Sequence, residues 1–159
     1  MIQRIHESGW NEIQSYLRMK FGEVEAACPY YLHSIYKSFT GVRALSGKGF
    51  ANEIIEEAKI HAMKERTKLE EKSPEEIRQF LFDHALGIEC SGFISHVLYA
   101  IHGKKFFRSL SDDSFGARVL RMIRPFQQIN VHLLQKSAQK ISFVDAKPED
   151  IIVTRGGMH

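Results

Sequence analysis

Residues 88–98 decide how this chain folds, and they read I-E-C-S-G-F-I-S-H-V-L. Phe93, Val97, Leu98 and Ile101 recur at helical spacing behind Cys90, and Gly103 is a natural stop, so we expect a helix over residues 89–102 with these four side chains buried. Cys90 then lies where the helix begins. The free N–H groups and the positive dipole end of a helix stabilise a thiolate, which is the reactive form of cysteine. The pattern favours a nucleophilic Cys90, although a free cysteine is also a common core residue.

A second indication comes from residues 150–159, which read D-I-I-V-T-R-G-G-M-H. The apolar run Ile151 to Val153 is typical of a short strand, and a glycine turn separates it from His159. A cysteine on a helix and a histidine on a facing strand form the pair that a thiol hydrolase uses as nucleophile and base. The sequence therefore predicts Cys90 and His159 as catalytic residues.

Both segments resemble one known family. Residues 87–98 resemble the cysteine motif of the NlpC-type, papain-like cysteine peptidases, which cut the peptides of the bacterial cell wall. Residues 147–152, K-P-E-D-I-I, resemble the turn and strand that precede the catalytic histidine in that family. The order of cysteine and histidine also agrees, and the resemblance covers roughly the second half of the chain.

The resemblance implies a thiol hydrolase of peptide or amide bonds, with a peptidoglycan stem peptide as substrate and no cofactor. It makes Cys90 the nucleophile and His159 the base. Pro29-Tyr30 is similar to the family's Pro-Tyr element, whose tyrosine helps to bind the reacting carbonyl group, so the resemblance gives Tyr30 this role. An alternative is that Tyr30 is a core aromatic residue.

The chain departs from the family pattern at three places. Glu89 replaces the usual aspartate, and Glu149 replaces the usual glycine. Relatives also continue past the histidine with further strands and a polar residue that orients the imidazole. We therefore expect a truncated or degenerate member, whose own activity is in doubt. A catalytically inactive binding module is the alternative function, and self-association through the exposed edge of the strand at residues 151–153 is a further expectation.

Composition sets broader limits. The 159 residues suit one domain, with a divergent helical part at residues 1–86 and a family-like core at residues 87–159. Neither a transmembrane run nor a secretory signal is evident, so the sequence favours the cytoplasm or a non-classical route of export. The net charge of +3 argues only weakly for an acidic partner. Cys28 and Cys90 are expected to be free thiols, and no histidine pair has a convincing metal-ligand spacing.

The remaining patterns predict an α+β fold. The resemblance implies a papain-like NlpC-type arrangement. In it, a helix-rich N-terminal half precedes the cysteine helix, which packs on a short antiparallel sheet. Helices are expected from Trp10 to about Phe21, over residues 50–72, from Pro74 behind a capping box, and over residues 113–124. Residues 39–49 are expected to be loop, and residues 140–144 and 151–153 to be strands. Arg118, Arg121 and Arg124 are interpreted as a solvated face, with nucleic-acid binding as a less favoured alternative, and His96 is expected at the surface or on a helix face.

Overall fold

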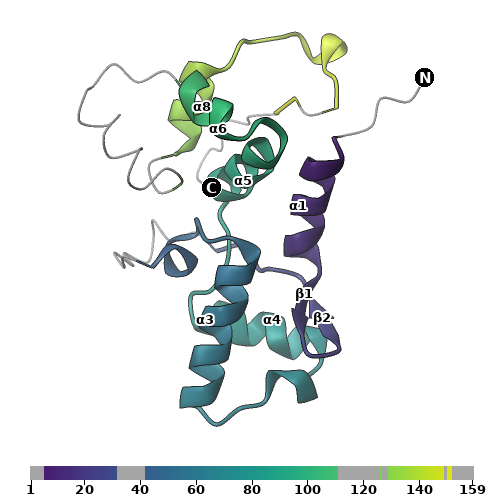
Figure 1. Ribbon diagram of the computed structural model, residues 1–159, viewed down its shortest axis with the longest axis vertical. Helices are drawn as coiled ribbons and strands as arrows, with labels where there is room; N and C mark the ends of the chain where they lie inside the picture. Colours follow the sequence, from purple (N-terminus) through teal and green to yellow (C-terminus); the bar gives the residue numbers. More distant parts are fainter. Residues whose placement is uncertain (1–5, 32–41, 111–125, 127–128, 149, 152–159) are drawn as a thin grey trace, which may run out of the picture.

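The computed structural model describes residues 6–31, 42–110, 126, 129–148, 150 and 151. In this part the chain is rich in helix and carries a small two-stranded antiparallel sheet, so the α+β prediction is confirmed in its coarse form. The elements follow one another as α1 (Glu7–Leu17), β1 (Met19–Phe21), β2 (Val24–Ala26), η1 (Arg43–Ser46), α3 (Ala51–Lys64), η2 (Leu69–Glu71), α4 (Pro74–Asp83), α5 (Cys90–His102), α6 (Lys104–Ser109), α8 (Val131–Ser137) and η3 (Phe143–Asp145). Figure 1 shows the hairpin β1–β2, α3 and α4 gathered at one end of the molecule, with α5, α6 and α8 at the other.

The sheet is a tight hairpin that begins directly after α1. Phe21 pairs with Val24, so only Gly22 and Glu23 form the turn. Gly22 takes a φ of 65°, a left-handed conformation that glycine adopts without steric cost. Helices α3 and α4 pack against this hairpin.

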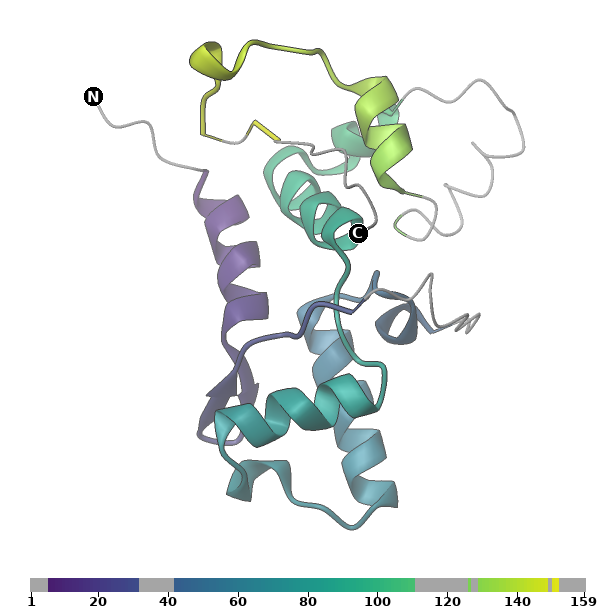
Figure 2. The ribbon, with the colours of Figure 1, turned by 180° about the vertical axis from the view of Figure 1, so that it is seen from behind.

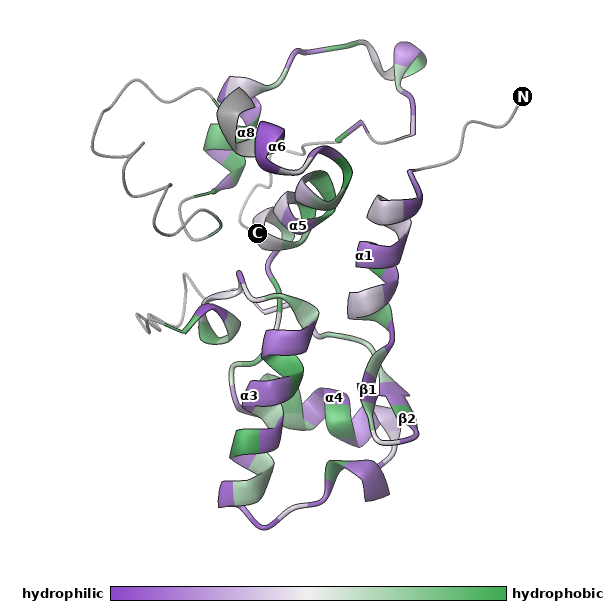
Figure 3. Ribbon diagram, viewed as in Figure 1, coloured by the Kyte–Doolittle hydropathy of each residue, from purple (hydrophilic) through white to green (hydrophobic). Residues whose placement is uncertain are grey.

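Local sequence signals explain α3 and α4. The capping box of α4 is present as predicted, because Ser73 Oγ accepts from the Glu76 N–H (3.3 Å) and the Glu76 carboxylate accepts from the Ser73 N–H (2.8 Å). Helix α3 buries Ile54, Ala58 and Ala62, which are each four residues apart. Figure 3 shows the resulting hydrophobic and hydrophilic bands along α3.

Helix α5 lies between two hydrophobic clusters. Its Phe93 packs against the larger cluster, which is built by α1, the hairpin, α3 and α4. Its Ile94, Leu98 and Tyr99 pack against the smaller cluster, which α6 and α8 contribute to. Figures 1 and 2 show α5 beside α1, the helix with which it makes its most extensive contact. The N-terminal end of α5 is therefore supported from two sides.

The boundaries of α5 match the prediction, but its buried face does not. Of the four predicted inward residues only Val97 is fully buried, whereas Phe93, Leu98 and Ile101 are half-buried. The most buried positions include small and polar residues, namely Ser91, Gly92, Ser95 and His96. His96, expected at the surface or on a helix face, lies on the buried face of α5 and is fully buried. Small residues on this face let neighbouring backbone approach closely, which the hydrophobic pattern alone does not predict.

The predicted first helix is too long. Helix α1 ends at Leu17, and residues 19–21 form β1, whose alternating burial follows a strand period. In α1, Trp10 and Leu17 are 50% and 52% exposed, while Tyr16 is buried. Pairing with β2 is a tertiary constraint that overrides the helical spacing of Phe21.

Three other boundaries differ from the prediction. The helix expected over residues 50–72 ends at Lys64, since Arg66 has a positive φ of 55°, and a short 3₁₀ turn follows at η2. The loop expected at residues 39–49 contains the 3₁₀ turn η1, and its residues 39–41 lie outside the described part. The helix expected over residues 113–124 also lies outside it.

The strand predicted at residues 140–144 is wrong. Residues 140–142 have no regular structure and η3 occupies the rest, with Val144 90% exposed. A β-branched residue favours a strand only where neighbours cover it, and here none does. Ile151 belongs to no strand, and residues 152–153 lie outside the described part. Among the described elements, α5 therefore packs mainly on α1 and α6 rather than on the sheet that was expected beneath it.

Candidate active site

Cys90 is the first residue of α5 and its side chain is exposed. Glu89 precedes it with an extended backbone and accepts the first helical hydrogen bond, from the Phe93 N–H (2.9 Å). The amides of Cys90, Ser91 and Gly92 therefore have no carbonyl partner one turn earlier in the helix. An exposed thiol lies at the positive end of a helix of 13 residues, as the sequence predicts.

The segment containing Tyr30 lies directly beside this helix start. Ile88 donates its N–H to Pro29 O (3.1 Å) and accepts from the Tyr31 N–H (3.3 Å), which forms a parallel bridge between Tyr30 and Ile88. Gly87 permits this approach, because a Cβ there would lie 2.7 Å from Pro29 O. The contact joins two segments that are far apart in the sequence.

The Tyr30 side chain is 55% exposed and lies within electrostatic range of the thiol. Partial burial raises the pKa of Tyr30 above its usual value, and negative charge on Cys90 and Glu89 raises it further. The phenol therefore stays protonated near neutral pH and keeps a hydrogen to donate. The bridge to Ile88 thus holds Tyr30 in a segment that adjoins the start of α5, within electrostatic range of Cys90.

Lys48 is the site residue that sequence analysis missed. Its ammonium group lies under the first turn of α5, where it donates to Ser91 Oγ (2.5 Å) and to Ile129 O (2.7 Å) and forms an ion pair with Glu89. Ser91 Oγ in turn donates to the Glu89 carboxylate (2.8 Å). We call Lys48, Glu89 and Ser91 the Lys48 network. A lysine between two glycines resembles a solvated loop residue, so the sequence contains no signal for its burial.

The backbone of the same loop contacts α5 directly. Gly47 O accepts from the Glu89 N–H (3.2 Å), and Lys48 O accepts from His96 Nε2 (3.0 Å). A Cβ at Gly92 would overlap the Gly47 carbonyl oxygen, so only glycine fits at this position. The glycine of the cysteine motif is therefore required for packing of the helix start against residues 47–49.

The other cysteine has a different environment. Cys28 is half-buried, and its thiol donates to Pro29 O (3.7 Å). Burial raises the pKa of Cys28 to about 12, so this thiol stays protonated near neutral pH. Both cysteines are free, as expected. Exposure and position at the helix start therefore distinguish Cys90 from Cys28.

His159, the predicted base, lies outside the described residues, as do Arg118, Arg121 and Arg124. His96 is close to Cys90 in sequence, but its ring faces the core between Phe50 and Phe126. Within the described part, no group of histidine, cysteine and acidic side chains is arranged to hold a metal ion. None of the described helices is both long and apolar enough to cross a membrane.

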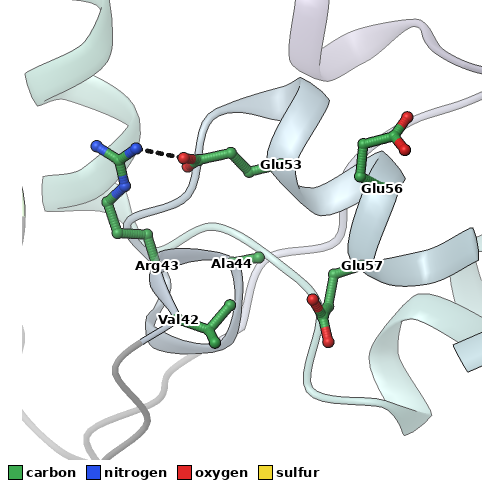
Figure 4. A pocket seen from close by; sticks show the side chains of 6 residues that line it. All are labelled: Val42, Arg43, Ala44, Glu53, Glu56 and Glu57. Atoms are coloured by element: carbon green, nitrogen blue, oxygen red, sulfur yellow. Dashed lines mark hydrogen bonds and ion pairs between the residues drawn. The ribbon is translucent and has the colours of Figure 1, made fainter. Parts of the chain in front are cut away.

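A pocket of about 370 Å³ lies apart from this site, where η1 meets α3 (Figure 4). Two of its carboxylates pair with cations, Glu53 with Arg43 and Glu56 with Lys59, and Glu57 lies 3.6 Å from His61 Nε2. The residues that line it are Val42, Arg43, Ala44, Glu53, Glu56 and Glu57. None of these residues belongs to the surroundings of Cys90, so the pocket adds nothing to the chemistry there.

Comparisons of the chain with protein-family models, with curated proteins and with solved structures gave no match. The case for a function therefore rests on the residues around Cys90.

Proposed function

We propose that this chain is a thiol hydrolase of peptide or amide bonds, with Cys90 as the nucleophile and His159 as the base. The observation that supports it best is the exposed Cys90 thiol at the start of α5, with the Tyr30 segment bridged to Ile88 just before it and Tyr30 within electrostatic range of the thiol. The two residues come from segments that only the fold brings together. Such convergence of an exposed nucleophile and a hydroxyl donor is what acyl transfer requires.

In the proposed reaction the Cys90 thiolate attacks the carbonyl carbon of the substrate. The Tyr30 hydroxyl and the Cys90 amide donate hydrogen bonds to the oxygen that becomes negatively charged. His159 gives a proton to the leaving amine, the C–N bond breaks and a thioester to Cys90 remains. Water then attacks the thioester with His159 as base, which releases a carboxylic acid and restores the thiol. On the family resemblance, the substrate is a peptidoglycan stem peptide.

The experiment incubates the full chain with muropeptides and follows new amino groups and product masses. We expect hydrolysis by the wild type and by the control variant Cys28→Ser, and none by Cys90→Ser. Tyr30→Phe removes one oxyanion donor and is expected to lower kcat by about 10²-fold or more. His159→Ala is expected to abolish turnover.

Two outcomes would contradict the proposal. Hydrolysis that persists in Cys90→Ser would show that another group carries the reaction. A wild-type chain that binds muropeptides without cleaving them, with Cys90 intact, would identify the binding module that the sequence left as an alternative.

A further inference from the structure

Lys48 occupies an unusual environment in this fold. Its side chain is 5% exposed, and among the described residues it is the only fully buried side chain of the lysine, arginine, aspartate and glutamate types. A buried charge is costly unless it is paired and hydrogen-bonded. A lysine retained there in spite of that cost calls for a function that an apolar residue of similar size would not provide.

Each of the three N–H bonds of the Lys48 ammonium group has an acceptor. The three acceptors are the Glu89 carboxylate, Ser91 Oγ and Ile129 O. Burial lowers the pKa of Lys48, and the hydrogen bond and charge of Glu89 oppose that effect. Full satisfaction by three acceptors, one of them a carboxylate, keeps the group an ammonium ion.

The partners of Lys48 flank the thiol in sequence. Glu89 precedes Cys90 and Ser91 follows it, and both are held from beneath the helix by one cation. The Lys48 carbonyl also accepts from His96 on the second turn of α5. These contacts fix the rotation of the helix start, so that Cys90 alone among residues 90–92 is exposed.

We propose that Lys48 is a positioning residue for Cys90, which fixes the first turn of α5 through Glu89 and Ser91 and balances the negative charge of Glu89 beside the thiol. Among the described residues, the charged and titratable groups near the thiol are Glu89, its neighbour in the chain, and Lys48 and Tyr30, which both lie within electrostatic range of Cys90. The inference depends on the proposed function only for naming the reaction that Cys90 performs, because its test measures the thiol itself.

The charge balance predicts opposite effects for the two partners of one ion pair. Lys48→Met leaves the Glu89 carboxylate alone near the thiol, which disfavours the thiolate. Glu89→Gln leaves the Lys48 ammonium alone, which favours it. A purely structural role predicts that both variants change thiol reactivity in the same direction, since each breaks the same pair.

The experiment measures the rate of iodoacetamide alkylation of Cys90 against pH, in the full chain carrying Cys28→Ser so that a single thiol is followed. At a pH below the midpoint of the profile, Lys48→Met is expected to react about tenfold more slowly and Glu89→Gln about tenfold faster. The double variant Lys48→Met/Glu89→Gln removes both charges, and its profile is expected between those of the single variants. Circular dichroism and urea unfolding report whether each variant is folded.

Shifts in the same direction, or no shift in folded variants, would overturn the inference. If Lys48→Met does not fold, the test is the comparison of Glu89→Gln with the double variant. The inference then requires the midpoint of the alkylation profile to lie at a higher pH in the double variant than in Glu89→Gln. The proposed function can fail independently. A chain that hydrolyses nothing but shows opposite shifts retains Lys48 as a positioning residue and loses the hydrolase assignment.

Discussion

The burial of His96 makes the free energy of unfolding of this protein depend on pH. The ring is fully buried, stacks on Phe126 with centroids 4.2 Å apart and contacts Phe50 at the same distance. A carbonyl oxygen only accepts, so the Nε2 that faces Lys48 O carries the hydrogen. The Nδ1 atom is buried, and no described residue offers it a hydrogen bond. Protonation would place a second N–H and a positive charge among apolar rings.

Burial therefore lowers the pKa of His96 from 6.5 to about 4, and the positive charges of Arg43 and Lys48 add to that effect. Between these two pH values the unfolded chain binds a proton that the folded chain does not, so stability falls as the pH falls through this window. The linkage relation gives a loss of about 1.4 kcal/mol by pH 5.5, and of roughly 3 kcal/mol once the pH is below 4.

The assay is urea unfolding of the wild type and of His96→Gln at pH 7.5 and at pH 5.5. Glutamine keeps an N–H donor for Lys48 O but gains no proton in this range. Each protein is compared with itself, so the packing cost of the substitution and the titration of other groups cancel in the difference. The wild type should lose about 1.4 kcal/mol more than the variant between the two pH values. Equal losses in both proteins would refute the reasoning.

Three further changes have defined outcomes. Gly92→Ala places a Cβ against the Gly47 carbonyl and should lower the free energy of unfolding by about 1–3 kcal/mol. Turnover that depends on Cys90 should also become slower. An unchanged urea midpoint would contradict the packing argument. Burial lowers the pKa of His84, but its hydrogen bonds to a backbone carbonyl and to Glu65 (2.6 Å) outweigh this and raise it above 6.5. The stabilisation that protonated His84 contributes is therefore complete below pH 6.5 and is lost as the pH rises through the raised pKa. Thermal unfolding at pH 6 and pH 9 should show this loss in the wild type and not in His84→Gln. Ser73→Ala removes the cap of α4 and should cost about 1 kcal/mol in urea unfolding, whereas Ser73→Thr, which keeps the hydroxyl group, should cost less.

Local signals in the sequence were sufficient for several elements. The capping box at Ser73 begins α4, Gly103 ends α5, and Cys90 is the first helical residue, because each depends on side chains and backbone within one or two turns. In residues 147–152, which resemble the family's turn and strand, the Asp150 N–H donates to Lys147 O (3.1 Å). The role that the family resemblance gives to Tyr30 stays a prediction; the structure pairs Tyr30 with Ile88, two residues before Cys90.

The tertiary structure alone decided the rest, since those features depend on segments far apart in the chain. Lys48 is buried because its acceptors come from α5 and from Ile129, and His96 is buried because Lys48 O, Phe50 and Phe126 surround it. Residues 19–21 become a strand because residues 24–26 pair with them. Residues 140–144 form no strand: they pair with none of the described strands, and Val144 is 90% exposed. The sequence pattern shows which side chains are apolar, but it does not show which segments of the chain will pack against them.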